Sequence, residues 1–362
     1  MRMSSSRFVP RRAYIEEAAL SYSLGRNVAE KLKDLGVPVR VLKLRARPQV
    51  PGENPTRVYE EAKHTLVVRV RKNKDFATCK PSAHYQLPLV SSCPGLCEYC
   101  YLQTTLGPRP YIRVYANIEE ILSTAKSLVQ ERSPEETVFE GAATSDPLAI
   151  EYLTGSLARA IEFFGGLKGS RFRFVTKFSD VAPLLGLPHG GRTTVRVSVN
   201  ADYVIRTFEH NTSPLNERLE ALRQVRLAGY PVGVMIGPII TFDGWKEGYC
   251  EMMSLLACAL DRPEAGIGAT HDAHSASVAS GTGVPGVPFE LITHRFTGRA
   301  KKNILSVFPK SRLPLDEGER QLKFGQFGYT KYVYPKGEMD AIWAFFEREI
   351  ERVHGGFVQY LV

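Results

Sequence analysis

Six short apolar runs separated by helical patterns constrain the fold of this 362-residue chain more than any other feature. The runs lie at residues 85–90, 137–140, 172–176, 194–199, 232–236 and 289–293, and each is apolar enough for a buried parallel strand. Because a strand, a helix and a second parallel strand connect in a right-handed unit, this alternation builds a doubly wound sheet or an incomplete (β/α)6 barrel. In both folds we expect reactive side chains at the carboxyl ends of the strands.

The segments between these runs have helical periodicity and recognisable ends. Asn117 is expected to cap one helix and Pro214 to open another, and a third, at residues 150–165, ends at a glycine pair. Residues 12–71 carry a separate set of short apolar runs around one helical stretch. We expect this part to be a small α/β piece that serves packing only.

Composition and pattern divide the chain into four parts. The predicted parts are an N-terminal α/β extension at residues 1–83, a partial barrel at 84–262, a flexible insertion at 263–288, and the last barrel strand with a C-terminal region at 289–362. The insertion is rich in Gly, Ala and Ser and poor in large apolar residues, which is typical of a surface loop. For that reason its two histidines, His271 and His274, are not expected to bind a metal.

The charge balance favours a polyanionic partner. Lys and Arg outnumber Asp and Glu by 47 to 38, which gives a net charge of +9 and a pI near 9.2. Residues 323–336 predict a hairpin in which Lys alternates with Tyr and Phe, a composition that suits a phosphate backbone and stacked bases. The alternative is an ordinary solvated hairpin. No run of about 18 apolar residues is present and the N-terminus lacks the apolar core of a signal peptide, so no membrane span and a cytoplasmic location are expected.

Three cysteines crowd the loop 91-SSCPGLCEYCY-101, namely Cys93, Cys97 and Cys100. A structural zinc ion takes four protein ligands, so this loop would need His84 or Cys79 from upstream to complete such a site. An iron–sulfur cluster can instead be held at three irons while its fourth iron stays free. The third alternative is a cysteine loop without any metal.

Two further cysteines have a simpler interpretation. Cys250 and Cys258 fall in an apolar helical pattern, where we expect buried and inert thiols.

The spacing C-x3-C-x2-C, with an aromatic residue before the last cysteine, is similar to the signature of the radical S-adenosylmethionine superfamily. The chain also resembles the spore photoproduct lyase family over nearly its whole length. This likeness is carried by residues 79–117, 139–146, 174–178, 196–200 and 325–336. Enzymes of that family revert the ultraviolet lesion 5-thyminyl-5,6-dihydrothymine in DNA to two thymines. The resemblance implies an α/β fold with an incomplete (β/α)6 barrel of the radical S-adenosylmethionine type, a small N-terminal α/β extension and a basic C-terminal hairpin region.

The resemblance also implies cofactors, partners and a reaction. A [4Fe–4S] cluster and S-adenosylmethionine would generate a 5′-deoxyadenosyl radical that removes a hydrogen atom from C6 of the dihydrothymine ring. Expected partners are double-stranded DNA that contains the lesion and an electron donor such as flavodoxin or ferredoxin, in a spore core or germinating spore. The residues to which the resemblance assigns the cluster are Cys93, Cys97 and Cys100, and those for S-adenosylmethionine are Ser145, Lys177 and Ser198. For contacts to the lesion and its phosphates we expect Arg295, Tyr329, Lys331 and Tyr332.

One catalytic position departs from the family pattern. Family members have a cysteine that donates the last hydrogen atom, whereas 140-EGAATSD-146 has Ala143 in its place. An alanine methyl group holds its hydrogens too strongly for that step. Three explanations are open. The residue was replaced by engineering, or the hydrogen donor is another residue, with Tyr99, Tyr101 and Cys79 as candidates. The third is a related enzyme that ends the radical chemistry differently, on this lesion or on another nucleic-acid or nucleotide substrate. A catalytically silent DNA-binding protein stabilised by zinc or a cluster is the alternative from another functional class.

Overall fold

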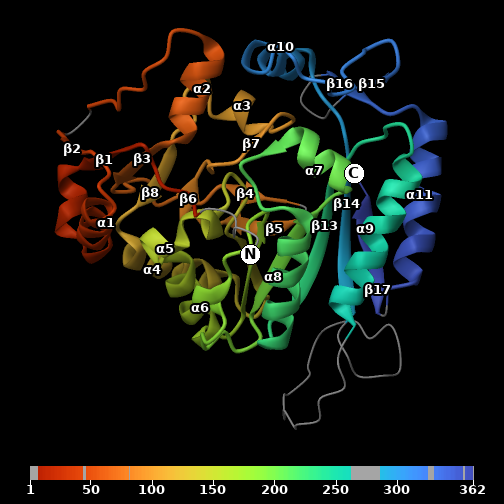
Figure 1. Ribbon diagram of the computed structural model, residues 1–362. Helices are drawn as coiled ribbons and strands as arrows, with labels where there is room; N and C mark the ends of the chain where they lie inside the picture. Colours follow the sequence, from red (N-terminus) through yellow and green to blue (C-terminus); the bar gives the residue numbers. More distant parts are fainter. Residues whose placement is uncertain are drawn as a thin grey trace, which may run out of the picture.

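A curled sheet of eight strands forms the centre of the computed structural model (Figure 1). Every neighbouring pair from β5 to β17 is parallel, and β4 adds an antiparallel edge. The sheet order is β17 (Gly356–Leu361), β14 (Val287–Thr293), β13 (Val232–Ile239), β11 (Thr193–Val199), β10 (Ser170–Thr176), β9 (Thr137–Glu140), β5 (Ala83–Gln86) and β4 (Thr78–Cys79). The predicted incomplete barrel is confirmed.

The described residues are 7–43, 46–80, 82–261, 286–324, 330–353 and 355–361. His271, His274 and nearly all of the predicted insertion lie outside them, as does Tyr329.

Five of the six predicted strands are single strands of this sheet, but the first is not. Residues 85–90 divide into β5 and the short strand β6 (Val90–Ser91), which belongs to a different sheet. Pro88 lies at the break, and a proline cannot donate a ladder hydrogen bond inside a sheet. The cysteine loop therefore follows β6 and not the barrel strand directly.

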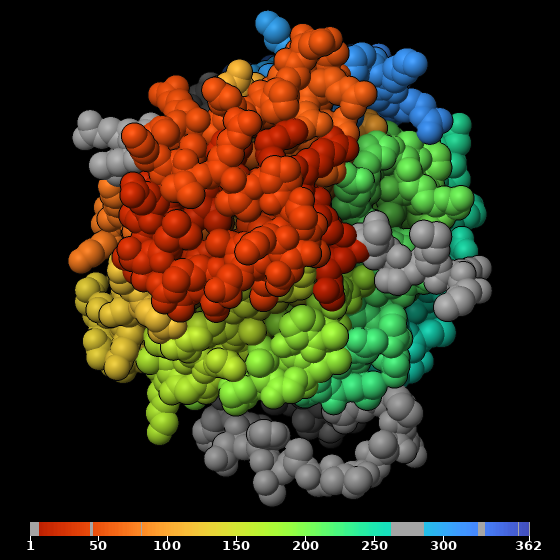
Figure 2. Space-filling view, turned by 60° about the vertical axis from the view of Figure 1, so that its left-hand side comes forward, coloured from red at the N-terminus to blue at the C-terminus, as the bar shows by residue number. Residues whose placement is uncertain are grey.

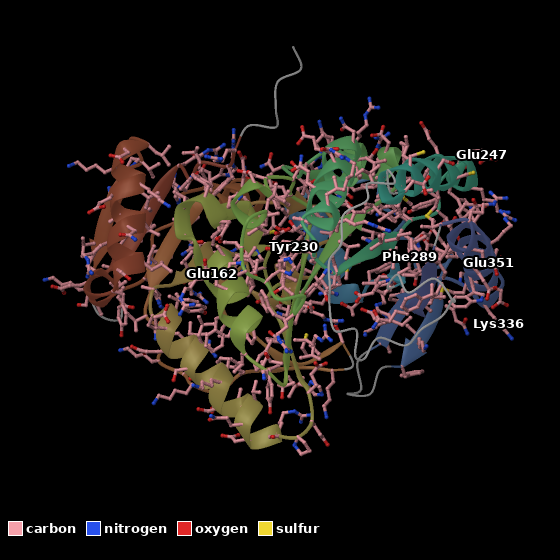
Figure 3. All side chains as sticks on the ribbon, turned by 90° about the horizontal axis from the view of Figure 1, so that it is seen from below. Glu162, Tyr230, Glu247, Phe289, Lys336 and Glu351 are labelled. Atoms are coloured by element: carbon pink, nitrogen blue, oxygen red, sulfur yellow. The ribbon has the colours of Figure 1, made fainter. Side chains whose placement is uncertain are left out.

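Helices connect the strands and cover the outer face of the sheet. They are α4 (Ile118–Arg132), α5 (Glu151–Thr154), α6 (Ser156–Gly166), α8 (Leu215–Leu227), α9 (Trp245–Leu260) and α11 (Lys336–Glu351). Seen from below, Phe289 lies on an inner strand, whereas Glu247 and Glu351 lie on peripheral helices (Figure 3). Gly155, with φ of 63°, interrupts the helix predicted at 150–165. Asn117 and Pro214 occupy the predicted N-terminal positions of α4 and α8.

A second sheet, built mainly from the N-terminal extension, covers one side of the molecule (Figure 2). Its order is β2 (Val39–Leu42), β1 (Arg12–Glu16), β3 (Thr65–Arg69), β8 (Ile112–Tyr115) and β6. Helices α1 (Ser23–Asp34) and α2 (Pro55–Lys63) and the 3-10 helix Glu17–Ser21 connect its strands. The division of the chain at residue 83 stays a prediction, since β6 and β8 join this sheet from beyond it.

The cysteine loop is covered by elements from distant parts of the sequence. The short helix α3 (Leu102–Thr105) follows the loop, and α10 (Gly298–Val307) packs on both α3 and α2 at the top of the molecule (Figure 1). The hydroxyl of Thr56 on α2 donates to the carbonyl of Val307, at 2.7 Å. The N-terminal extension and the C-terminal region thus meet above the loop.

The C-terminal region contains the predicted hairpin and one unpredicted unit. Strands β15 (Gln321–Phe324) and β16 (Thr330–Val333) pair antiparallel, as expected. Helix α11 and strand β17 then extend the barrel by a further strand, which the sequence reasoning did not foresee. The remaining short elements are β7 (Leu96–Cys97), α7 (Asp202–Phe208), β12 (Glu209–His210) and the 3-10 helices Pro147–Ile150 and Ala182–Leu184.

Two smaller expectations can be compared with the structure. Cys250 is half-buried and Cys258 is exposed on α9, so the expectation of two buried thiols is wrong for Cys258. The apolar residues near them, among them Met252, Met253 and Leu256, take the buried face of that helix instead. In the described ranges no helix is long and apolar enough to cross a bilayer.

Candidate active site

The cysteine loop is attached to the loop that follows β9. The backbone N–H of Ser92 donates to the carbonyl of Thr144 at 2.8 Å, and Ser92 forms a parallel bridge with Ser145. Ser92 has φ of 66° and is buried, and its hydroxyl donates to the carbonyl of Pro110 at 2.7 Å. These bonds hold the cysteines beside the carboxyl end of the barrel strands, where the sequence predicts reactive groups.

Two of the three predicted cluster ligands, Cys93 and Cys97, lie on either side of a glycine. A Cβ at Gly95 would stand 3.6 Å from the Cys93 sulfur and 3.8 Å from the Cys97 sulfur, so glycine keeps the space between these thiols open. Cys97 pairs with Glu209 in the β7–β12 ladder, and the N–H of Cys100 donates to its carbonyl at 3.1 Å. An open space lined by thiols from one loop has the donor chemistry of an iron–sulfur cluster.

The extra ligands considered for zinc are engaged elsewhere. His84 accepts a hydrogen bond from the backbone N–H of Val138 at 2.9 Å. Cys79 lies at the edge of the central sheet, where Glu140, Arg173, Arg196 and Ser82 all act on its thiol. In the described part of the chain no three Cys, His, Asp or Glu side chains form a group for a single metal ion.

Lys177, predicted to contact S-adenosylmethionine, lies at the centre of a buried polar network. Its ammonium donates to the hydroxyl of Tyr99 and to Oε1 of Glu209, each at 2.7 Å, and Tyr99 also donates to Glu209. Arg218 donates to the other carboxylate oxygen at 2.6 Å. Burial alone would raise the pKa of Glu209, but Arg218 and Lys177 lower it to about 2. The carboxylate therefore stays ionised and fixes both cations.

The two predicted serines differ in their surroundings. Ser198 is buried on β11 and its hydroxyl has no hydrogen-bond partner among the described residues. Such an orphaned hydroxyl is a free contact for a bound molecule. Ser145 is half-buried, and its neighbour Asp146 accepts from the hydroxyl of Thr176 at 2.9 Å and from the N–H of Lys177 at 2.8 Å. Asp146 thereby ties the Ser145 loop to the end of β10.

Ala143 lies directly beside Tyr101. The phenol of Tyr101 donates to the carbonyl of Ala143, although the residue as a whole is 57% exposed. Desolvation of the phenol, together with Cys100, Cys79, Cys93 and Glu140, raises the pKa of Tyr101. Burial and Glu140 likewise raise the pKa of Cys79, while Arg173 opposes them. Of the donors considered for the missing cysteine, Tyr101 and Cys79 thus lie close to one another, whereas Tyr99 belongs to the Lys177 network.

Sequence reasoning missed a set of charges inside the barrel. Arg196 on β11 forms ion pairs with Glu140 and, at 2.7 Å, with Glu290, and Arg173 lies 3.2 Å from Glu140. Tyr360 on β17 donates to Glu290 at 2.8 Å. The only sequence signal is the charge at alternate positions of otherwise apolar strands. Glu209 and Arg218 were missed as well, because both come from segments without a strand signal.

Of the residues predicted to contact DNA, Arg295, Lys331 and Tyr332 lie in or next to the hairpin. Lys331 lies opposite Lys323 in the β15–β16 ladder, and burial, Arg295 and Lys323 lower the pKa of Lys331. Tyr332 stacks on Phe296, with ring centroids 5.2 Å apart. These contacts hold Tyr332 against the barrel and bring three cations together beside it.

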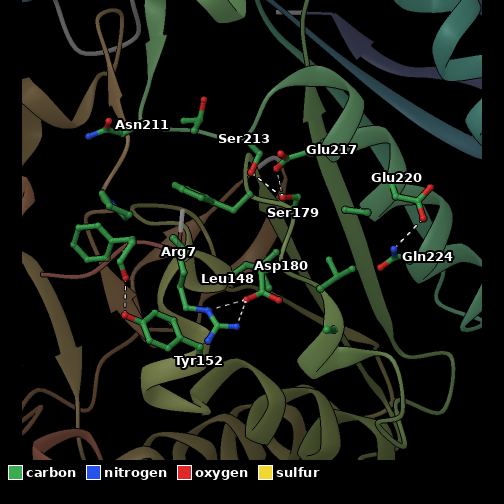
Figure 4. Close-up of a pocket in the computed structure, with 18 of the residues that line it drawn as sticks. Arg7, Leu148, Tyr152, Ser179, Asp180, Asn211, Ser213, Glu217, Glu220 and Gln224 are labelled. Atoms are coloured by element: carbon green, nitrogen blue, oxygen red, sulfur yellow. Dashed lines mark hydrogen bonds and ion pairs between the residues drawn. The ribbon is translucent and has the colours of Figure 1, made fainter. Parts of the chain in front are cut away.

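A cavity of about 1330 Å³ lies apart from the predicted cofactor residues (Figure 4). It opens between the N-terminal segment and α8. Arg7 pairs with Asp180 there at 2.9 Å, and Tyr152 donates to the carbonyl of Phe8. Its lining reaches the cysteine loop only at Pro94. A smaller cavity, about 140 Å³, is lined by Ala143 and Ser145 among others.

Comparison with known proteins gives concordant matches. The family model for spore photoproduct lyase matches residues 8–361. The chain is 42% identical to the spore photoproduct lyase of Clostridium acetobutylicum, over 94% of this chain and 95% of the relative. It is 44% identical to that of Bacillus subtilis, over 92% and 93%.

Solved structures agree with these relatives. A spore photoproduct lyase complexed with dinucleoside spore photoproduct has a TM-score of 0.89 at 43% identity and covers 99% of this chain and 100% of its own. A second solved structure is a double mutant of spore photoproduct lyase, in which one cysteine is changed to alanine and one serine to cysteine. It has a TM-score of 0.89 at 43% identity and covers 99% of this chain and 100% of its own. It was solved with bound AdoMet and dinucleoside spore photoproduct.

Proposed function

This chain belongs to the spore photoproduct lyase family, and from that membership we propose that it repairs spore photoproduct in DNA by radical S-adenosylmethionine chemistry. The observation that carries the proposal is the joining of the cysteine loop to the Ser145 loop at the carboxyl end of the half-barrel. Relatives solved with AdoMet and with the dinucleoside lesion support both the cofactor and the substrate class.

We assign a [4Fe–4S] cluster to Cys93, Cys97 and Cys100. The space that Gly95 leaves between two of the thiols supports this assignment. When bound, the cluster and S-adenosylmethionine supply a carbon-centred radical that removes a hydrogen atom from the lesion. The cluster also requires a one-electron donor such as flavodoxin or ferredoxin.

The chain's own groups bind and orient the cofactor and the lesion. Lys177, fixed by Glu209 and Tyr99, would present its ammonium to the carboxylate of S-adenosylmethionine. The unpartnered hydroxyl of Ser198, and the hydroxyl of Ser145, which donates to the carbonyl of Gly141 at 3.5 Å, would bind its polar groups. The cations of Arg295 and Lys331 beside the hairpin would contact the phosphates of double-stranded DNA around the lesion.

Cys79 supplies the last hydrogen atom in place of the residue absent at Ala143. Its raised pKa keeps the sulfur protonated, and it interacts with the Tyr101 phenol that bonds to Ala143. In the double mutant of the relative, the introduced cysteine and the introduced alanine are separated by the same number of residues as Cys79 and Ala143. In this step the S–H bond of Cys79 breaks, a C–H bond forms on the product thymine, and the unpaired electron remains on the Cys79 sulfur. Transfer of the hydroxyl hydrogen of the neighbouring Tyr101 would re-form the S–H bond and leave the unpaired electron on the Tyr101 oxygen.

Repair of a spore photoproduct dinucleotide in D2O tests both proposals. The reconstituted, reduced protein should convert it to the dinucleotide with two normal thymines, one of them labelled with deuterium, because thiol hydrogens exchange with solvent. Cys79→Ser should lose most of the clean repair and form adducts of the product radical, whereas Cys258→Ser, at an exposed position on α9, should behave as wild type.

The outcomes separate the two proposals. Formation of 5′-deoxyadenosine by the wild-type protein without any conversion of the dinucleotide rejects the lesion as substrate. Clean, deuterium-labelled repair by Cys79→Ser rejects Cys79 as the donor.

A further inference from the structure

Helix α2 of the N-terminal extension presents two polar side chains to the cysteine loop. Tyr59 and Lys63 are four residues apart and share one face of the helix, and both are almost fully buried. The sequence reasoning regarded this extension as packing only. Two polar groups on the buried face of a surface helix require a reason, because burial of such groups is costly unless they are paired.

Lys63 is a buried cation next to a cluster ligand. Its ammonium donates to the backbone carbonyl of Cys93 at 3.0 Å and lies 5.4 Å from the centre of the Tyr59 ring. Among the residues that the structure describes, no carboxylate forms an ion pair with it. A neutral carbonyl and an aromatic ring leave the positive charge only partly compensated.

Tyr59 supplies a second, independent observation. Its hydroxyl is buried and has no hydrogen-bond partner among the described residues. Burial raises the pKa of Tyr59 well above its usual value, and Cys100, Cys93 and Cys97 raise it further. Independently of this shift, the hydroxyl is a buried hydrogen-bond donor without an acceptor among the described residues, on the same buried face of α2 as Lys63. The ring packs edge-on against Phe308, with centroids 5.9 Å apart, which restricts its movement.

From these contacts we propose that Tyr59 and Lys63 adjust the reduction potential of the iron–sulfur cluster, an inference that rests on the cluster of the proposed function. A [4Fe–4S] core held by three thiolates is an anion, and reduction adds a further negative charge. A nearby ammonium, and a buried hydroxyl whose hydrogen-bond donor is unused, would both stabilise the reduced form more than the oxidised form. Both residues thus raise the potential, and the electron donor can reduce the cluster more readily.

The test is a reductive titration of the reconstituted protein followed by electron paramagnetic resonance, without substrate. Tyr59→Phe keeps the ring and removes the hydroxyl, and Lys63→Met keeps most of the side-chain volume and removes the charge. Each variant should bind the same amount of iron as wild type and titrate at a more negative potential. Arg57→Met removes a charge from the exposed face of the same helix, where Arg57 pairs with Glu60 at 3.0 Å, and should leave the potential unchanged.

Every outcome has a defined meaning. A wild-type protein that binds no cluster after reconstitution refutes the proposed function. A loaded Tyr59→Phe variant with the wild-type potential refutes the role of the hydroxyl, and the same result for Lys63→Met refutes that of the charge. Tyr59→Phe is nearly isosteric with the wild-type residue and should keep the cluster. If Lys63→Met alone lost the cluster, the potential of the Tyr59→Phe variant would decide whether α2 adjusts the potential.

Discussion

Gly141 lies two residues before Ala143, against the ring of Phe172. A Cβ at this position would stand 2.7 Å from the tip of that ring, closer than real Cβ contacts allow. Phe172 is buried and stacks on Phe164 with centroids 5.1 Å apart, so the ring has little freedom to move aside. Glycine at position 141 is thus a packing requirement of this chain's own core.

The first prediction concerns this glycine. Gly141→Ala should lower the free energy of unfolding by about 1–3 kcal/mol, the usual cost of overpacking a core. Urea denaturation followed by circular dichroism measures the change. Gly166→Ala serves as the control, because a Cβ at Gly166 meets nothing within 4 Å, and it should be close to neutral. Equal stabilities for the two variants would contradict the packing argument.

At the scale of single residues, the sequence predicts the groups that a local motif specifies. Cys93, Cys97 and Cys100 share one loop, so their spacing alone indicates a common site. Tyr59 and Lys63 escape such reasoning, because only the tertiary contact of α2 brings them to the loop.

Among the elements, the junction of α5 and α6 depends on one buried carboxyl group. Glu151 accepts hydrogen bonds from the N–H groups of Leu157 and Ala158 at the start of α6, each at 2.8 Å. Burial raises the pKa of Glu151 to about 7, against these bonds, which lower it. The carboxyl group replaces the cap that Gly155, without a side chain, cannot provide.

This shift has a defined consequence for stability. A glutamate in the unfolded chain has an ordinary pKa of 4.5, so between pH 4.5 and about 7 the unfolded chain releases the proton that the folded chain still holds. Over this interval the free energy of unfolding falls as the pH rises, on the order of 3 kcal/mol in all. Glu151→Gln should remove this part of the pH dependence.

Urea denaturation of both proteins at pH 5 and pH 8 provides the measurement. The stability of the wild-type protein should fall relative to that of Glu151→Gln as the pH rises. A constant difference between the two proteins would show that Glu151 does not titrate in this interval.

Predictability also differs between elements. Strands buried on both faces, such as β9 and β11, are read correctly because their apolar runs end at clear breaks. The prediction of one strand at residues 85–90 was wrong, because periodicity cannot show that β5 and β6 join different sheets on either side of Pro88. Strand β17 was not predicted, because its exposed and half-buried residues alternate at the edge of the sheet, where no continuous apolar run forms.

Over the whole molecule, the elements that surround the cysteine loop come from both ends of the chain. The α2 helix of the N-terminal extension and α10 of the C-terminal region meet above the loop, while the half-barrel lies beneath it (Figure 1). Lys63 and Tyr59 face the loop from α2, and the hairpin with its cations follows α10. The site therefore depends on assembly of the complete chain, which a local sequence motif cannot reveal.

The net charge of +9 leads to a prediction for DNA binding at this scale. The affinity for lesion-containing duplex DNA should fall as salt rises, because phosphate contacts release counterions. If Lys331 contacts a phosphate, Lys331→Gln should weaken binding and reduce the slope of log affinity against log salt by about one. Fluorescence anisotropy at several salt concentrations measures the slope. Lys33→Gln is the control, because it changes the net charge equally but lies on α1, far from the hairpin in Figure 1, and it should keep the wild-type slope. Equal slopes for both variants would exclude a phosphate contact by Lys331.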